Sequence, residues 1–188
     1  MPSDRAWSAA NDDAAAPPLP PPARLQELLF DASRLGRIDV LPALLSAGTD
    51  IEAHDPKGHT PLILAAYNGR AAATELLLGR GAIVDAPDAS RGNTALMGVA
   101  FKGYDPFVER LLLAGADPNR TNLAGQTALM IATMFGHGAI VDRLLAAGAD
   151  PLMVDAAGNS ALSVAIGQGN DLMVARLNGH CPTLAGSR

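Results

Sequence analysis

The sequence predicts an all-α repeat solenoid: helix-turn-helix units stacked side by side and joined by short β-hairpin-like loops. Three recurring signals support this class. A Thr/Ser-Pro/Ala-Leu triplet begins at Thr60, Thr94, Thr127 and Ser160. A glycine follows nine residues later, at Gly69, Gly103, Gly136 and Gly169. Paired leucines precede a second set of glycines, Gly48, Gly81, Gly115 and Gly148. The triplets recur every 33 residues, with one step of 34, and a period in this range is typical of a solenoid.

One unit, residues 55–87, shows how the local signals work. Thr60 suits a helix N-cap, and Pro61 suits the first helical position, where its missing N–H has no intrahelical partner to lose. Gly69 can take the left-handed backbone that ends this helix, and a second helix is expected over 71–78, ended by Gly81. Helices this short are not stable alone in water, so the units must stack.

The segment 55–87, DPKGHTPLILAAYNGRAAATELLLGRGAIVDAP, resembles the ankyrin repeat, whose signature combines D-x-x-G-x-T-P-L-H-x-A-A-x-x-G with LL-x-x-G-A-D. Residues 88–121 and 122–154 also match well. Residues 155–181 match weakly, and residues 22–54 keep only the second half of the signature. Units one to five are thus residues 22–54, 55–87, 88–121, 122–154 and 155–181. The resemblance implies a single ankyrin domain over 22–182. The Ala/Pro-rich composition of residues 1–21 predicts a disordered leader, and we expect a mobile tail at 183–188.

The family histidine that follows T-P-L is absent from this chain. Its place is taken by Ile63, Met97, Met130 and Ser163. In the family this histidine helps to tie successive units by hydrogen bonds. The resemblance therefore implies that apolar contacts do more of the stacking here.

The end units carry weaker signals than the middle ones. In unit one we expect helices from Arg24 to about Leu35 and over 38–47, the second containing Pro42. In unit five the second helix is expected over 171–178, and the run of residues 179–182 should stop it. The single tryptophan, Trp7, lies in the leader as either a mobile residue or a small docking anchor.

Composition argues against several functional classes. The net charge of −5 disfavours a general binder of nucleic acid or anionic membranes. A single cysteine cannot form an intramolecular disulfide or a thiolate zinc site. No apolar stretch suits a membrane span or a signal peptide, so we expect a cytoplasmic protein, with secretion without a cleaved signal left open. The preference for Arg over Lys suggests GC-rich bacterial coding.

Catalytic motifs are not evident, and we expect no enzyme activity and no cofactor. His54, Asp55 and His59 share one loop and could ligate a metal, although such spacing is common by chance. His180 and Cys181 adjoin without an orienting third group. His137 is better explained as a structural residue at the start of a helix.

The resemblance implies a protein-binding surface at the hairpin tips and at the ends of the first helices. The matching positions are Lys57, His59, Tyr67, Asn68, Arg91, Asn93, Phe101, Lys102, Gln126, Met134 and Phe135. Tyr67, Phe101 and Phe135 should form a row across units two to four, either exposed as an interface anchor or packed sideways to fill the groove. Lys57, Arg91 and Lys102, with Arg34, would make this face basic.

We therefore expect a monomeric, non-enzymatic adaptor, inhibitor or accessory protein. Its concave face would bind one partner protein through an apolar segment that carries acidic residues. The alternative is a small-molecule or metal carrier that uses His54, His59 and the groove.

Overall fold

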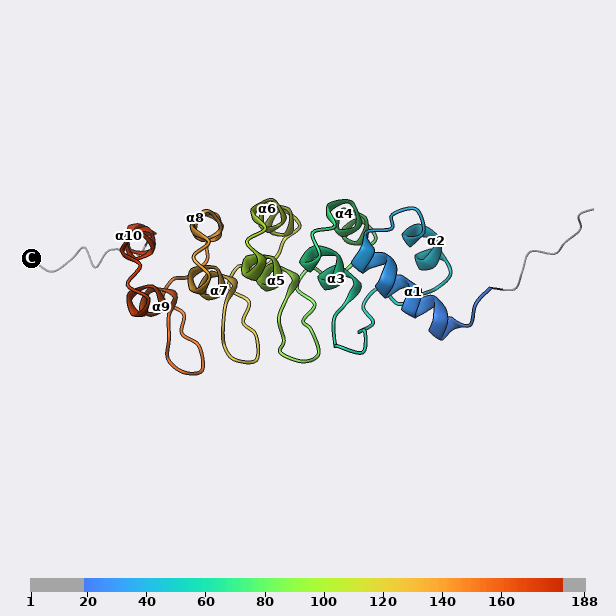
Figure 1. Ribbon diagram of the computed structural model, residues 1–188, viewed down its shortest axis with the longest axis horizontal. Coiled ribbons are helices and arrows are strands. Elements are labelled where there is room, and N and C mark those ends of the chain that lie inside the picture. The colour runs from blue at the N-terminus through green and yellow to red at the C-terminus, as the bar shows by residue number, and fades with distance from the viewer. Residues whose placement is uncertain (1–18, 181–188) are drawn as a thin grey trace, which may run out of the picture.

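The computed structural model describes residues 19–180, which form ten α-helices arranged as five pairs in a row (Figure 1). The first helices of the units are α1 Pro22–Leu35, α3 Pro61–Tyr67, α5 Ala95–Lys102, α7 Ala128–Met134 and α9 Ala161–Gly167. The second helices are α2 Leu41–Ser46, α4 Ala71–Gly79, α6 Asp105–Leu113, α8 Gly138–Ala146 and α10 Asp171–His180. The fold is the predicted all-α repeat solenoid.

The two sets of helices form two layers. Neighbouring first helices pack on one another from α1 to α9, and each first helix also packs on the second helix of its own unit. A long loop connects the second helix of each unit to the first helix of the next one. These loops, between α2 and α3, α4 and α5, α6 and α7, and α8 and α9, all project to the same side of the molecule (Figure 1). The solenoid therefore carries a layer of helices along one side and a fringe of loops along the other.

The predicted helix signals act in every unit that carries them. The hydroxyl of Thr60 accepts a hydrogen bond from the backbone N–H of Ile63, and Thr94, Thr127 and Ser160 do the same for their own helices. Gly69 and Gly81 have φ values of 68° and 88°, in the left-handed region predicted for them. Local sequence therefore sets where most of these helices begin and end.

Apolar contacts replace the missing histidine in the middle of the stack. Ile63, Met97 and Met130 are 5%, 2% and 2% exposed and belong to one continuous core. In unit five the same position behaves differently. Ser163 is exposed, and its side chain instead completes a capping box with Ser160.

Hydrogen bonds between neighbouring loops add to this stacking. Backbone N–H groups of Ala89, Leu123 and Ala156 donate to carbonyls of the preceding loop, at 2.8, 2.9 and 2.9 Å. Each hairpin-like loop is itself closed by a backbone bond, such as Asp55 N–H to the His59 carbonyl at 2.9 Å. Between residues 19 and 180, strand pairing is limited to one isolated bridge, which joins Val154 and Ser160. The connections in this range are therefore loops that resemble hairpins without forming regular strands.

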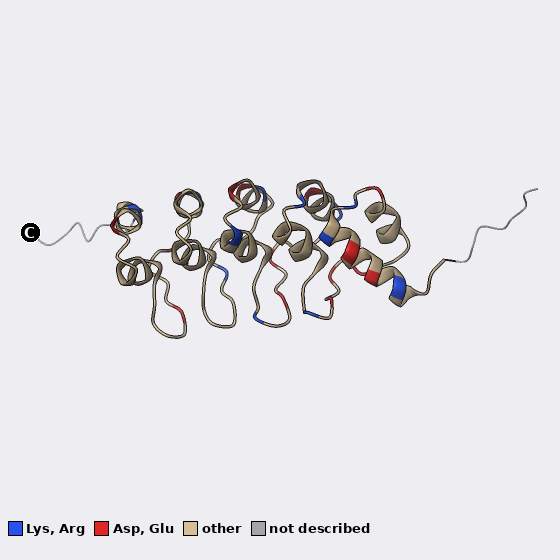
Figure 2. Ribbon diagram, in the orientation of Figure 1, with Lys and Arg blue, Asp and Glu red and all other residues tan. Residues whose placement is uncertain are grey.

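Ion pairs link the second helices across the outer layer, where charged residues recur on α4, α6, α8 and α10 (Figure 2). Arg143 on α8 contacts Asp105 at 2.8 Å and Glu109 at 3.3 Å, both on α6. Two further pairs of this kind are Arg110 with Glu75 and Arg176 with Asp142. In each pair an arginine reaches back to an acid of the preceding unit.

Several helix boundaries in the end units differ from the sequence prediction. Helix α1 begins at Pro22 rather than Arg24, because proline suits the first helical position. Helix α2 begins at Leu41 rather than Ile38, because Pro42 is tolerated only in the first turn of a helix. Helix α10 continues to His180 rather than ending at Asn178. Gly179 lowers helix propensity but does not by itself end a helix. A proline disfavours the helical backbone only at the residue before it, so Pro182 does not affect residues 179 and 180.

The expected leader and tail lie largely outside the described residues, since only 19–21 of the leader are included. The domain limits of 22–182 therefore remain a prediction. Within 19–180, none of the helices is long and apolar enough to cross a membrane.

Candidate functional site

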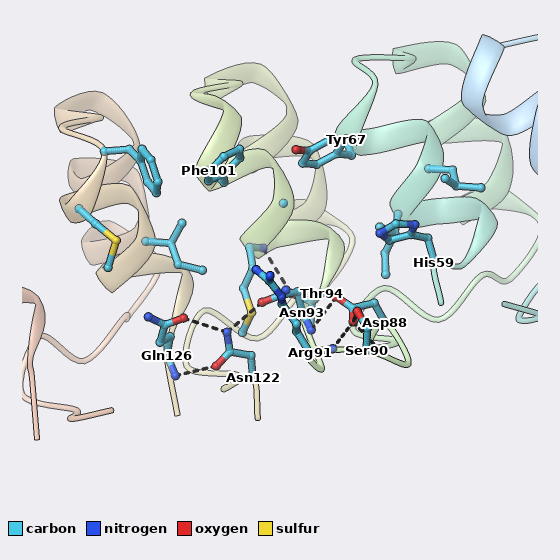
Figure 3. A pocket seen from close by; sticks show the side chains of 17 residues that line it. His59, Tyr67, Asp88, Ser90, Arg91, Asn93, Thr94, Phe101, Asn122 and Gln126 are labelled. Carbon is cyan, nitrogen blue, oxygen red and sulfur yellow. Dashed lines mark hydrogen bonds between the residues drawn. The ribbon is translucent and has the colours of Figure 1, made fainter. Parts of the chain in front are cut away.

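A groove of about 510 Å³ runs across units two to four, between the first helices and the loops (Figure 3). It collects eight of the eleven predicted binding residues. They are His59, Tyr67, Arg91, Asn93, Phe101, Gln126, Met134 and Phe135. Lys57, Asn68 and Lys102 are exposed but do not line it. Most of the residues predicted from the sequence therefore line one groove, but other residues that line it were not predicted.

Tyr67, Phe101 and Phe135 form a row along one side of the groove. The Tyr67 and Phe101 rings are stacked with centroids 6.3 Å apart, and Phe101 meets Phe135 edge-on at 4.6 Å. Tyr67, Phe101 and Phe135 nevertheless remain 37%, 41% and 48% exposed, and Met134 is 38% exposed. The two arrangements considered from the sequence thus coexist: the rings contact one another and still face the groove.

The edge-on contact follows from a shift of one residue in unit four. Tyr67 and Phe101 lie seven residues after their N-cap threonines, where unit four has Met134. Phe135 lies one position later, in register with Lys102 of unit three. In units three and four the side chain at this later position reaches back to the preceding unit: Lys102 Nζ lies 4.4 Å from the centroid of the Tyr67 ring, and Phe135 packs against Phe101.

Polar side chains form the floor of the groove at the base of the loops (Figure 3). Asn122 Nδ2 donates to Asn93 Oδ1 at 2.9 Å and to Gln126 Oε1 at 3.2 Å, which links the loops of units three and four. Asp88 accepts backbone N–H groups of Ser90 at 2.9 Å and Asn93 at 3.1 Å. The floor is therefore a preformed hydrogen-bond network.

Asp88 and Asn122 line the groove, although neither is among the binding positions that the family resemblance implies. Burial raises the pKa of Asp88, but backbone N–H groups and the Ser90 hydroxyl outweigh it and hold the pKa below the ordinary value. Asp55 follows the same pattern, with the N–H groups of His59 and Lys57 as its main donors. The 33-residue recurrence of an Asp or Asn before each loop was the signal that could have placed them there.

The basic character of this face is narrower than expected. Arg91 lines the groove, with Lys57 and Lys102 nearby on the same units. Arg34, however, forms ion pairs with Asp31 at 2.8 Å and with Asp55 at 3.1 Å, and it does not line the groove. Its charge is balanced by these two carboxylates, so Arg34 is not part of a basic binding surface.

Of the three candidate metal ligands, His54 contacts the next unit, whereas His59 lies beside Asp55. His54 Nε2 lies 3.1 Å from the Pro87 carbonyl in the next unit, and His59 Nδ1 lies 3.4 Å from Asp55 Oδ1. Among residues 19–180, no group of three or more His, Cys, Asp or Glu side chains is placed to hold a metal ion. His137 Nε2 contacts the Phe101 carbonyl at 3.2 Å, which agrees with a structural role. The His180 and Cys181 side chains lie outside the described part of the chain.

Comparison with known proteins identifies the family. A model of ankyrin repeats, in three copies, matches residues 29–122 and 96–182. The chain belongs to the ankyrin repeat family. Ankyrin repeats are generally non-enzymatic modules that bind other proteins.

Several curated ankyrin proteins are similar to parts of the chain. Ankyrin repeat domain-containing protein SAT10 of Stachybotrys chartarum is 37% identical over 95 residues, 50% of this chain and 5% of the relative. Human ankyrin repeat and KH domain-containing protein 1 is 38% identical over 91 residues, covering 48% and 4%. An ankyrin repeat-containing protein of Treponema pallidum is 38% identical over 84 residues, covering 45% and 28%. The chain thus spans less than a third of the length of each of these relatives.

Proposed function

We propose that this ankyrin protein is a non-enzymatic adaptor, inhibitor or accessory protein that holds one partner protein in the groove of units two to four. The observation that carries the proposal is the row of Tyr67, Phe101 and Phe135, which stays 37–48% exposed while lining one hollow. Large, partly exposed apolar side chains gathered in a concavity are typical anchors of protein interfaces.

Rigidity of the groove supports the same proposal. The rings contact one another, and the floor is held by the bonds of Asn122 and Asp88. A preformed surface loses little conformational entropy when a partner binds, so more of the contact energy remains as affinity. The Asp88 carboxylate in the floor already accepts N–H groups of Ser90 and Asn93 and the Ser90 hydroxyl, so it serves to hold the loop.

Charge narrows the chemistry of the partner. Arg91 lines the groove beside the apolar row, and Lys102 lies over the Tyr67 ring at its edge. We therefore propose that the partner presents an apolar segment carrying one or more acidic residues. The acidic groups would meet Arg91 and Lys102, while the apolar side chains would cover Phe101 and Met134.

The partner is first identified in the native cell with a crosslinker attached to a residue of the groove. The decisive experiment then measures the affinity of the purified partner for the protein and its variants. Tyr67, Phe101 and Phe135 are replaced together by alanine, and Leu113→Ala, an exposed leucine on α6, serves as the matched control. We expect at least a tenfold loss of affinity for the triple variant, equivalent to about 1.4 kcal/mol, and no change for the control. Unchanged affinity in a folded triple variant rejects the proposal.

A small-molecule carrier is the second candidate, because about 510 Å³ lies within the range of small-ligand sites, roughly 300–1,000 Å³. Equilibrium dialysis against cell extract, with metal analysis before and after chelation, separates the two functions. A stoichiometric ligand retained by the native protein and lost in Phe101→Ala favours the carrier.

The remaining sequence-based expectations are part of this proposal: a monomer, no binding to nucleic acid or membranes, a cytoplasmic location and a bacterial source. Light scattering of the purified chain tests the first. A mass that corresponds to more than one copy at micromolar concentration contradicts it.

A further inference from the structure

A second apolar groove, of about 520 Å³, lies at the opposite end of the described chain from α10. It is lined by one face of α1, at Leu25, Leu28, Ala32 and Leu35, and by residues of α2 and the turn before it. In units two to five, a preceding unit packs against the first helix. No unit precedes unit one within residues 19–180, so this surface is left uncovered there.

Leu35 shows what kind of contact is missing. It occupies the repeat position of Asn68, Lys102, Phe135 and Gln168. Asn68 bonds to the Leu64 carbonyl of its own helix, whereas the other three side chains reach back to the preceding unit. Lys102 meets the Tyr67 ring, Phe135 meets the Phe101 ring, and Gln168 donates to the Met134 carbonyl at 2.8 Å. Leu35 is 60% exposed and lines the groove. An apolar side chain at a reach-back position calls for an apolar partner.

The sequence before α1 contains apolar side chains of this kind. Leu19 itself lines the groove, and the residues before it include Trp7, the single tryptophan of the protein. Leu19 follows Trp7 by twelve positions, and at about 3.1 Å per residue an extended segment of this length spans roughly 37 Å. The 14-residue helix α1 is about 21 Å long at 1.5 Å per residue. Trp7 can therefore reach any point along the groove.

We propose that the segment of residues 1–18 folds back along α1 and docks the Trp7 indole in this groove against Leu35, capping the open end of the solenoid. A tethered tryptophan acts at a millimolar effective concentration, which a second copy of the chain does not reach at micromolar concentrations. The leader is thus favoured over a second copy as the occupant. This site is separate from the groove of units two to four.

Trp7 fluorescence in the full chain tests the proposal directly, because no other residue contributes tryptophan emission. The variants are Leu35→Glu in the groove and Leu113→Glu as the matched control. Both leucines end a helix, and they are 60% and 82% exposed. We expect blue-shifted emission shielded from acrylamide in the native protein and the Leu113→Glu control. Leu35→Glu should shift the emission to the red and increase quenching several-fold, with an unchanged helical circular dichroism signal.

Ala43→Glu, at an exposed groove position on α2, repeats the test if Leu35→Glu unfolds. Three results overturn the proposal. The first is a native Trp7 as open to acrylamide as in the urea-unfolded chain. The second is shielding that persists in a folded Leu35→Glu or Ala43→Glu variant. The third is shielding that disappears on dilution, which identifies a second copy as the occupant.

Discussion

Leu129 in unit four and Leu162 in unit five hold the same place in the repeat, but they meet different surroundings. Leu129 is fully buried, whereas Leu162 is only partly buried against the core. Helix α7 buries six residues and α9 buries two, although the N-caps Thr127 and Ser160 bond in the same way. The motif therefore sets the local backbone, while the presence of neighbours on both sides sets how much it buries.

Unit one, at the other end of the solenoid from unit five, also lacks contacts that the middle units make. Its α1 has 14 residues where α3 has seven, and its reach-back residue Leu35 faces an open groove instead of a preceding unit. Arg37 likewise pairs with Asp39 of its own unit, while Arg70 at the equivalent position donates to the Arg34 carbonyl of the unit before it. Unit one therefore uses local partners where the later units use the unit before them.

The largest effect that distinguishes the middle from the end is expected in the core. Leu129→Ala should lower the free energy of unfolding by about 3 kcal/mol, because it leaves a cavity between two neighbours. Leu162→Ala should lower it by about 1 kcal/mol, because that side chain is already partly solvated. Urea denaturation followed by circular dichroism measures both. Equal losses would show that the end unit is packed as tightly as the middle.

A smaller effect is expected at the loop carboxylates, where Asp88 is buried and Asp155 is not. Asp88→Ala should cost about 2 kcal/mol, since it removes the acceptor of several backbone N–H groups. Asp88→Asn should cost less, because Asn122 naturally fills this role in unit four by accepting from Ala124 and Gln126. Thermal unfolding at neutral pH ranks the two variants, and equal losses would contradict the role given to the acceptor oxygen.

The pH dependence of these variants follows from the lowered pKa of Asp88 in the folded protein. Between the ordinary aspartate pKa of about 3.9 and the lower folded value, the unfolded chain binds more protons. The contribution of Asp88 is therefore complete above the ordinary pKa and is lost as the pH falls through the folded pKa. Asp88→Asn should flatten this acid-side loss, while Asp55 and Asp155, whose pKa values are also lowered, retain theirs.

The smallest effect concerns the outer ion pairs. Arg143→Met keeps the aliphatic stem but removes both contacts to α6, and it should cost at most about 1 kcal/mol in low salt and less in high salt. Arg37→Met, which removes a pair confined to unit one, should leave the melting temperature unchanged. Melting curves at two salt concentrations test this, and an equal response of the two variants would remove the distinction between middle and end.

Much of the fold could be predicted because its signals are local and repeated. The threonine caps, the left-handed glycines and the paired leucines recur at the same positions in successive units. A helix boundary that is ambiguous in one unit can therefore be predicted from the others. The starts of α2 and the end of α10 were less predictable, because those units carry single, weaker signals such as Pro42 and Gly179. The candidate groove was located through its aromatic row, but its floor at Asp88 and Asn122 depends on loops from different units meeting in space.

The sequence by itself determined the repeat, the helix caps and the positions from which Tyr67, Phe101 and Phe135 project, because these depend on residues within one turn of each other. Tertiary structure alone decided that Phe135 meets Phe101 edge-on, that Arg34 is paired with Asp55, and that Leu35 faces an open groove. The first two contacts join residues 34 and 21 positions apart in the sequence, and the third arises because no unit precedes unit one within residues 19–180. Burial and charge pairing in three dimensions set them, and no local pattern encodes them.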